Sequence, residues 1–272
     1  MINQIKALII ILFSQIRLNK DEINGNLNFY TLFKFQISYS LELPFSLGRT
    51  VRGLKFTSES DVYSKVVQDI LNGKNTNQLI NSLSIVYKNY ESKKVSEVNK
   101  FIENKKLRNY PCWAMILPWE KSELNSVKQR YLLSFYRNRS ENGMKFIDDK
   151  LDHVETMLSS RDHAKSHIDQ FKKLIQKIKR TGYINNYNDL PTAFILIKGK
   201  KWVWMMSSSG NHRAHIKSGL KSKFIKCRIC GVIKYSELYK SKNVKQKIFT
   251  ENEARYLFDK IFKGEKPIRG SI

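Results

Sequence analysis

Cysteine is scarce in this chain of 272 residues, which holds only Cys112, Cys227 and Cys230. A small secreted domain stapled by disulfides carries more cysteines, in even number, so the count excludes that class of protein. The scarcity indicates a reducing compartment. We therefore expect a cytoplasmic protein.

Long apolar runs are also lacking. The run at residues 7–13 is too short to cross a bilayer, and no small-residue cleavage site follows it before the charged residues that begin at Arg17. A buried strand or core helix is the better interpretation of this run than a targeting signal. We expect no membrane-spanning segment.

Acidic residues are few, with 24 Asp and Glu against 49 Lys and Arg, giving a formal net charge of +25. One explanation is an anionic partner such as a nucleic acid, an acidic or phosphorylated glycan, or a membrane surface. The other is compositional drift, because Lys outnumbers Arg here and phosphate-binding surfaces favour Arg. Both explanations stay open at this point.

The most informative stretch is Ser-Ser-Ser-Gly-Asn-His-Arg-Ala-His at residues 207–215. It follows a strand-like run at 202–206 and precedes a short helical pattern. A helix N-terminus offers backbone N–H groups and a partial positive charge, and glycine lets a ligand approach the backbone. The stretch predicts a phosphate site whose ligands are Ser208, Ser209, Gly210, Asn211, His212 and Arg213.

The surrounding pattern predicts an α+β protein. The predicted helices cover residues 58–71, 76–90, 96–106, 160–182 and 250–262, the last opening with a capping box at residues 250–253. The predicted strands cover residues 192–197, 202–206 and 224–230, the first two joined at Gly199. We expect a mixed, mainly helical N-terminal region at 1–157 and a small mixed-sheet domain with a C-terminal helix at 160–272.

The order of elements over residues 171–229, with Gly210-Asn211-His212-Arg213 at a strand-to-helix turn, resembles the ParB/sulfiredoxin-like superfamily. The resemblance implies a pocket for nucleotide phosphates, formed by backbone amides around Gly210 and the side chains of His212 and Arg213. It further implies a nucleoside triphosphate with Mg²⁺ as ligand, and NTP-dependent phosphotransfer or NTPase activity as the reaction.

Asn211 departs from that family. Sulfiredoxin has a cysteine at this position and ParB-type CTPases have a glutamate, so neither reaction transfers to this chain. A phosphoryl transfer usually needs Mg²⁺ held by a carboxylate. Asp189 and Glu237 are the candidate carboxylates nearest the motif in sequence. The expected function is thus binding of a nucleotide or other phosphorylated small molecule, with the reaction left open.

A zinc site is an alternative for the same residues. His212 and His215, followed by Cys227 and Cys230, have the ligand types and pair spacings of a zinc site. The sequence Cys-Arg-Ile-Cys-Gly at 227–231 also resembles the zinc knuckles of some nucleases, so a zinc-supported nuclease is an alternative function. Against it, Cys227 and Cys230 lie three apart in a predicted strand and would face opposite sides. A third interpretation is a turn with a structural role only.

Another class of function is a non-catalytic nucleic-acid-binding protein. The basic helical pattern at residues 128–139 would contact a phosphate backbone, although a solvated basic face explains it as well. Trp113 and Trp119 are either core residues or the wall of a ligand cleft. His153, His163 and His167 lie in a predicted helical region, the last two on one face, and we expect them to be surface or packing residues and not ligands.

Overall fold

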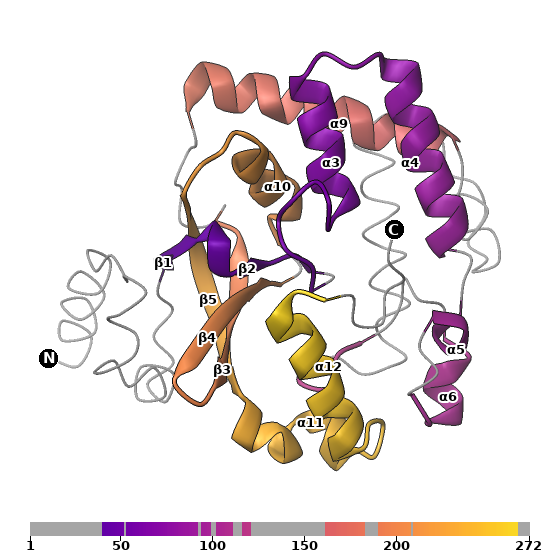
Figure 1. Ribbon diagram of the computed structural model, residues 1–272, viewed down its shortest axis with the longest axis vertical. Coiled ribbons are helices and arrows are strands. Elements are labelled where there is room, and N and C mark those ends of the chain that lie inside the picture. The colour runs from indigo at the N-terminus through magenta and orange to yellow at the C-terminus, as the bar shows by residue number, and fades with distance from the viewer. Residues whose placement is uncertain are drawn as a thin grey trace, which may run out of the picture.

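The computed structural model describes residues 40–51, 53–91, 94–98, 102–110, 116–120, 161–182, 190–207 and 209–265. These residues form a mixed α/β fold with one five-stranded sheet and eight α-helices (Figure 1). The strands are β1 (Ser40–Pro44), β2 (Gly48–Arg49), β3 (Thr192–Lys198), β4 (Lys201–Met206) and β5 (Phe224–Lys234). The α-helices are α3 (Val62–Leu71), α4 (Thr76–Glu91), α5 (Val95–Val98), α6 (Lys105–Arg108), α9 (Arg161–Thr181), α10 (Asn211–Gly219), α11 (Lys242–Lys245) and α12 (Glu251–Lys263). Two 3-10 helices, η2 (Phe45–Leu47) and η5 (Tyr235–Lys240), join them.

The sheet has the strand order β1-β5-β3-β4-β2 and mixes parallel and antiparallel pairs. Strands β3 and β4 form an antiparallel hairpin whose two-residue turn is Gly199-Lys200, with Gly199 at φ +58°. Glycine adopts this left-handed conformation without a steric cost. The predicted hairpin is therefore confirmed, and so is the predicted strand after α10, which continues as β5 to Lys234.

Strand β5 contains a bulge beside β3. Ala193 pairs with Ile229, but Phe194 pairs with Gly231, so Cys230 is an extra residue in the ladder. A bulge interrupts the alternation of side chains along a strand. The prediction that Cys227 and Cys230 face opposite sides by simple alternation therefore does not apply to this strand.

The two outer strands come from the N-terminal region. β1 pairs with β5 at one edge, and the short β2 pairs with β4 at the other. The region predicted to be a separate, mainly helical part thus contributes to the same sheet as residues 192–234. The predicted boundary between 157 and 160 lies outside the described residues.

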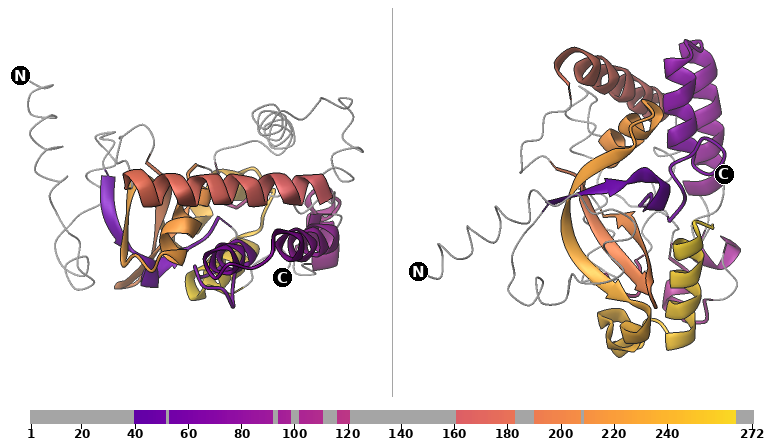
Figure 2. Two further views of the ribbon diagram at one scale, coloured as in Figure 1. Left: turned by 90° about the horizontal axis from the view of Figure 1, so that it is seen from above. Right: turned by 60° about the vertical axis from the view of Figure 1, so that its left-hand side comes forward.

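The two faces of the sheet are covered by different elements (Figure 2). One face, with Ile195 and Cys227, packs against Ala214 of α10 and Phe56 of the loop before α3. The opposite face packs against α12 through Phe258 and its neighbours. A further apolar cluster joins α3, α4 and α9 to α10 by way of Ile216. Helix α10 therefore lies between the sheet and a layer of helices.

Several predicted helices are confirmed with their caps. Asp61 caps α3 by accepting a hydrogen bond from the Ser64 N–H at 2.9 Å, and Thr250 and Glu253 form the expected capping box of α12. Gly182, at φ +71°, follows the end of α9, whose buried face includes Phe171. These ends agree with the sequence because caps are local signals.

The single helix predicted over residues 96–106 is wrong. Helix α5 ends at Val98 and α6 begins at Lys105, with no helix at residues 102–104. Ile102 is fully buried, and Asn104 caps a new helix by accepting from the Leu107 N–H at 3.0 Å. Tertiary packing and a competing cap therefore overrule the local helical pattern.

A buried arginine links β2 to α12. The guanidinium of Arg49 donates to the carbonyls of Ile261 and Phe262 at 2.9 and 2.6 Å, and to that of Gly48 at 2.8 Å. Burial lowers the pKa of Arg49 to about 10, which leaves it charged at neutral pH. The side chain adds donors to the carbonyls at the end of α12, where Ile261 O also accepts the Gly264 N–H at 2.9 Å, and it complements the negative end of the helix.

Candidate functional site: the turn before α10

The candidate site is the turn that connects β4 to α10. The backbone is fixed to the start of β3, because Ser207 N–H donates to Thr192 O at 2.8 Å and Thr192 N–H donates to Ser209 O at 3.2 Å. Gly210 follows at φ +82° and is the N-cap of α10. The strand-turn-helix arrangement expected from the sequence is present.

Gly210 is required by both its conformation and its surroundings. A β-carbon at this position would lie 2.6 Å from the Pro191 Cα, which is a backbone atom and cannot move aside. Its positive φ adds a second penalty for any L side chain. The turn is therefore closely packed against the strand beside it, which supports the structural interpretation as well as the functional one.

The N-terminus of α10 differs from those of α3 and α12 in its capping. Glycine has no side chain, so Gly210 gives no side-chain cap to the first N–H groups of the helix, and the first turn holds no acidic residue. By contrast, α3 is capped by a carboxylate and α12 by a capping box. The partial positive charge at the start of α10 is thus not offset by an acid of its own first turn.

His212 points into the helical layer. Its ring lies edge-on to that of Phe171, with ring centres 4.9 Å apart, and 5.3 Å from that of His167. Burial, and secondarily the charge of His215, lower the pKa of His212 to about 4, so its imidazole is neutral at pH 7. We therefore assign the His212 side chain to packing. Of this residue, only the backbone N–H remains a candidate ligand at the turn.

Four of the five histidines of the chain lie in one series of aromatic contacts. His163 and His167 stand 4.5 Å apart by ring centre on one face of α9, as expected, and Tyr63 contacts His167, His212 and His215. His153 lies outside the described residues. The series joins α9 and α3 to α10, the helix that follows the turn.

The other predicted ligands lie in different environments. Arg213 is half-buried in the first turn of α10 and Ser209 is exposed, whereas Ser208 lies outside the described residues. The Oδ1 atom of Asn211 is buried and accepts no hydrogen bond within the described part of the chain. A buried acceptor of this kind has unused hydrogen-bonding capacity beside the turn.

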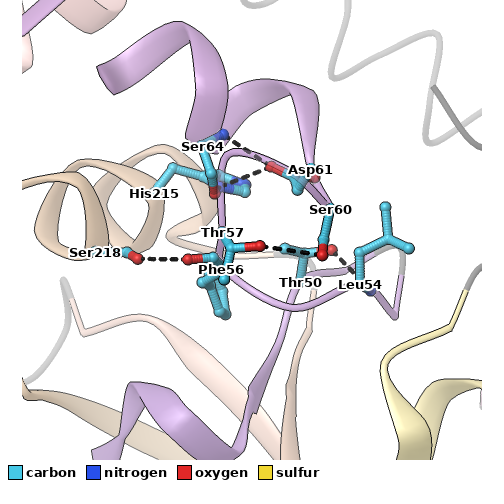
Figure 3. Close-up of polar contacts among 9 residues, drawn as sticks. All are labelled: Thr50, Leu54, Phe56, Thr57, Ser60, Asp61, Ser64, His215 and Ser218. Atoms are coloured by element: carbon cyan, nitrogen blue, oxygen red, sulfur yellow. Dashed lines mark hydrogen bonds and ion pairs between the residues drawn. The ribbon is translucent and has the colours of Figure 1, made fainter. Parts of the chain in front are cut away.

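A buried contact that the sequence did not predict holds α10 in place (Figure 3). His215 Nδ1 lies 3.3 Å from Asp61 Oδ2 and 3.2 Å from Ser64 Oγ, and all three side chains are buried. In addition, Ser218 Oγ donates to Phe56 O at 2.9 Å. These contacts fix α10 to α3 and to the loop before it.

The set of Ser64, His215 and Asp61 is not a catalytic triad. Serine and aspartate meet the same ring nitrogen, whereas a triad needs them on opposite nitrogens so that a proton can pass through the ring. His215 is also only 1% exposed. The set therefore positions a helix and does not reach a substrate.

The predicted zinc ligands do not come together. His215 is engaged by Asp61, and Cys230 Sγ donates to Ala193 O at 3.1 Å. Cys227 is buried in the sheet core, where burial raises the pKa of its thiol and disfavours the thiolate that binds zinc. Within the described residues, no group of three or more His, Cys, Asp or Glu is arranged to hold a metal ion.

The remaining candidates lie away from the turn or outside the described residues. Glu237 lies in η5, just after the last residue of β5, and its carboxylate is 3.8 Å from Lys234 Nζ. Trp119 is a core residue packed on Phe258. Four further candidates lie outside the described residues: Cys112, Trp113, Asp189 and the basic segment 128–139. None of the helices in the described ranges is both long and apolar enough to cross a membrane.

Comparisons with known proteins yielded no match: no family model matches the chain, no curated protein matches its sequence and no solved structure matches its fold.

Proposed function

We propose that the chain binds a phosphorylated ligand, the simplest being a nucleotide, at the turn between β4 and α10. The observation that carries the proposal is Gly210, a left-handed N-cap with no side chain in front of a nine-residue helix whose first turn has no acid. Such a helix start attracts an anion through its backbone N–H groups and its dipole. The resemblance of Gly210-Asn211-His212-Arg213 to the ParB/sulfiredoxin-like motif supports the same ligand class.

Two side chains indicate which ligands the proposed site would bind. Arg213 supplies a cation in the first turn of α10, and guanidinium groups suit phosphate oxygens because they donate in pairs. The buried Asn211 Oδ1 favours a ligand that also carries a donor, such as a ribose hydroxyl or a base amino group. A nucleotide meets both requirements at separate places, through its phosphates and through its ribose or base, whereas the only donor of inorganic phosphate is an O–H of the anion itself.

The proposal is for binding, with NTP-dependent phosphotransfer or NTPase activity as its enzymatic extension. That extension needs Mg²⁺ and a carboxylate to hold it. Glu237 lies in η5, which follows the end of β5 away from the turn, and Asp61 is buried beneath α10 and engaged by His215. Asn211, in place of the cysteine or glutamate of the resembled families, is itself uncharged.

A thermal-shift titration tests the proposal, using ATP, CTP, inorganic phosphate and tripolyphosphate, each with and without Mg²⁺. A nucleotide at about 100 times its Kd stabilises the folded state by about 2.7 kcal/mol, which corresponds to several degrees in Tm for a chain of this size. We expect the rise with a nucleotide to exceed that with phosphate.

The variant Arg213→Gln should abolish most of the nucleotide-dependent rise. Arg255→Gln is the matched control, since Arg255 is also on a helix but on α12, where it pairs with Glu251. Comparing the ligand-dependent rise, and not Tm itself, separates binding from stability. A rise of equal size in both variants, or no rise with any of the four ligands, contradicts the proposal.

A further inference from the structure

A second basic surface lies beyond the other end of β5. Helix α10 precedes the first residue of β5, whereas η5 and α11 follow its last residue and lie at the opposite end of the sheet (Figure 1). We call the surface formed by Tyr239, Lys240, Lys242, Lys245 and Lys247 the lysine corner. The proposed phosphate site does not include any of these residues.

The lysine corner has a strong excess of positive charge. Residues 234–247 contain five lysines and one carboxylate, that of Glu237. Glu237 lies 3.8 Å from Lys234, which is outside the corner. Three of the lysines of the corner, Lys240, Lys245 and Lys247, are exposed, and their own segment contains no second acid.

An exposed aromatic ring lies within this charge. Tyr239 is 50% exposed, one of three large apolar side chains exposed in the described part of the chain, and Lys240 Nζ stands 5.5 Å from its ring centre. An exposed ring among cations offers a face on which a nucleobase can stack while neighbouring ammonium groups meet the phosphates.

The backbone segment that carries the lysine corner is anchored in the core by buried side chains. Leu238 and Asn243 are fully buried, and the Asn243 side-chain amide donates to Leu117 O and Glu120 O at 2.8 and 3.1 Å. Phe249 closes the segment inside the core. Because the anchors alternate with exposed residues, the lysines and the tyrosine project from a fixed frame, which lowers the entropic cost of binding.

We propose that the lysine corner binds single-stranded nucleic acid. Its charge complements a phosphate backbone, and the exposed Tyr239 distinguishes the occupant, because bases are open to stacking in a single strand and are stacked on one another in a duplex. The corner also gives a cause for part of the net charge of +25.

The test is fluorescence anisotropy of a labelled oligo(dT) and a labelled oligo(U) of about 20 nucleotides, titrated with the full chain between about 50 and 200 mM salt. The corner variant is Lys240→Gln with Lys245→Gln and Lys247→Gly. Lys247 has φ +56°, so glycine removes its charge and relieves its backbone at once. We expect the affinity to fall by about tenfold or more and the salt slope by about 2.

A control variant removes the same charge elsewhere. It combines Lys173→Gln and Lys177→Gln on α9 with Lys221→Gly, since Lys221 is the other non-glycine residue with a positive φ, at +58°, within the described residues. The control should bind as the natural chain does. Tyr239→Ala should weaken binding by about fivefold or more and Tyr239→Phe should not, because phenylalanine keeps the stacking face.

Four outcomes overturn the proposal. They are no binding to either oligonucleotide, equal losses in the corner and control variants, a duplex bound as tightly as the single strand without any effect of Tyr239→Ala, and binding to anionic phosphatidylserine vesicles alone. Circular-dichroism melting of each variant confirms that it is folded. The thermal-shift titration with Arg213→Gln is independent of this test, so either proposal can fail alone.

Discussion

The imidazole of His215 on α10 lies 3.3 Å from the carboxylate of Asp61, the N-cap of α3, and neither side chain is more than 2% exposed. The same carboxylate oxygen accepts the Ser64 N–H at 2.9 Å. One buried oxygen thus ends α3 and fixes α10, and with it the turn that we propose as a phosphate site.

Asp61→Ala should therefore lower the free energy of unfolding by more than the loss of an ordinary N-cap does. Losing an N-cap costs about 1 kcal/mol, and leaving a buried partner unsatisfied adds about 1–3 kcal/mol. Chemical denaturation measures the loss. Thr250→Ala on α12 is the control, because Thr250 is exposed and caps its helix locally; it should cost about 1 kcal/mol. Equal losses would show that the contact with His215 adds nothing.

Gly210→Ala should destabilise the chain more than a positive φ alone explains. The left-handed conformation costs an L residue about 1–2 kcal/mol, and the clash with the Pro191 backbone adds about 1–3 kcal/mol. Gly73 is the matched control, since it has φ +77° and nothing within 4 Å of an added β-carbon. The two variants are compared by urea unfolding. If Gly73→Ala loses as much stability, the close approach of the turn to β3 is not significant.

Lowering the pH should destabilise the protein through His212. The pKa of a free histidine is near 6.5, and burial lowers that of His212 to about 4 in the folded state. Between these values the unfolded chain binds more protons, so the free energy of unfolding falls as the pH falls from about 6.5 toward about 4. His212→Phe, which keeps the ring against Phe171, should flatten this dependence. Urea unfolding at pH 7 and pH 4.5 measures it; parallel curves for the two proteins would contradict the assignment.

Arg49→Met should loosen the C-terminus of α12. Methionine keeps much of the side-chain volume and removes every donor, which leaves the buried carbonyls of Ile261 and Phe262 without this partner. We expect a loss of about 2–4 kcal/mol in chemical denaturation. Arg108→Met, at an exposed position on α6, should stay within about 0.5 kcal/mol. A small effect of Arg49→Met would show that water replaces the guanidinium.

The elements that could be predicted from the sequence are those with local signals. The β3–β4 hairpin was marked by Gly199, and α12 was marked by its capping box, so both were expected and are present. The two-residue strand β2 has no such signal, because its pairing with β4 is set by packing far along the chain. The break before α6 was missed because the burial of Ile102 is set by tertiary packing, although the cap residue Asn104 is a local signal.

The turn of the candidate site could be predicted from the sequence, but the tertiary contacts that hold the turn in place could not. Gly210 between a strand and a helix is a local pattern, whereas its contact with Pro191 and the fixing of α10 by His215 depend on residues distant in sequence; Ser64 and His215 are 151 positions apart. His212 and His215 look alike in sequence, yet one packs on α9 and the other meets Asp61. Only the fold distinguishes their roles.

The most direct test of the central claim is the location of the ligand on the backbone. In amide-resolved NMR of the full chain titrated with the nucleotide that gives the largest thermal shift, we expect the largest and saturable changes at the amides of Gly210, Asn211, His212 and Arg213, with little change at residues 239–247. Changes concentrated elsewhere, with the amides at the start of α10 unmoved, would contradict the proposed site.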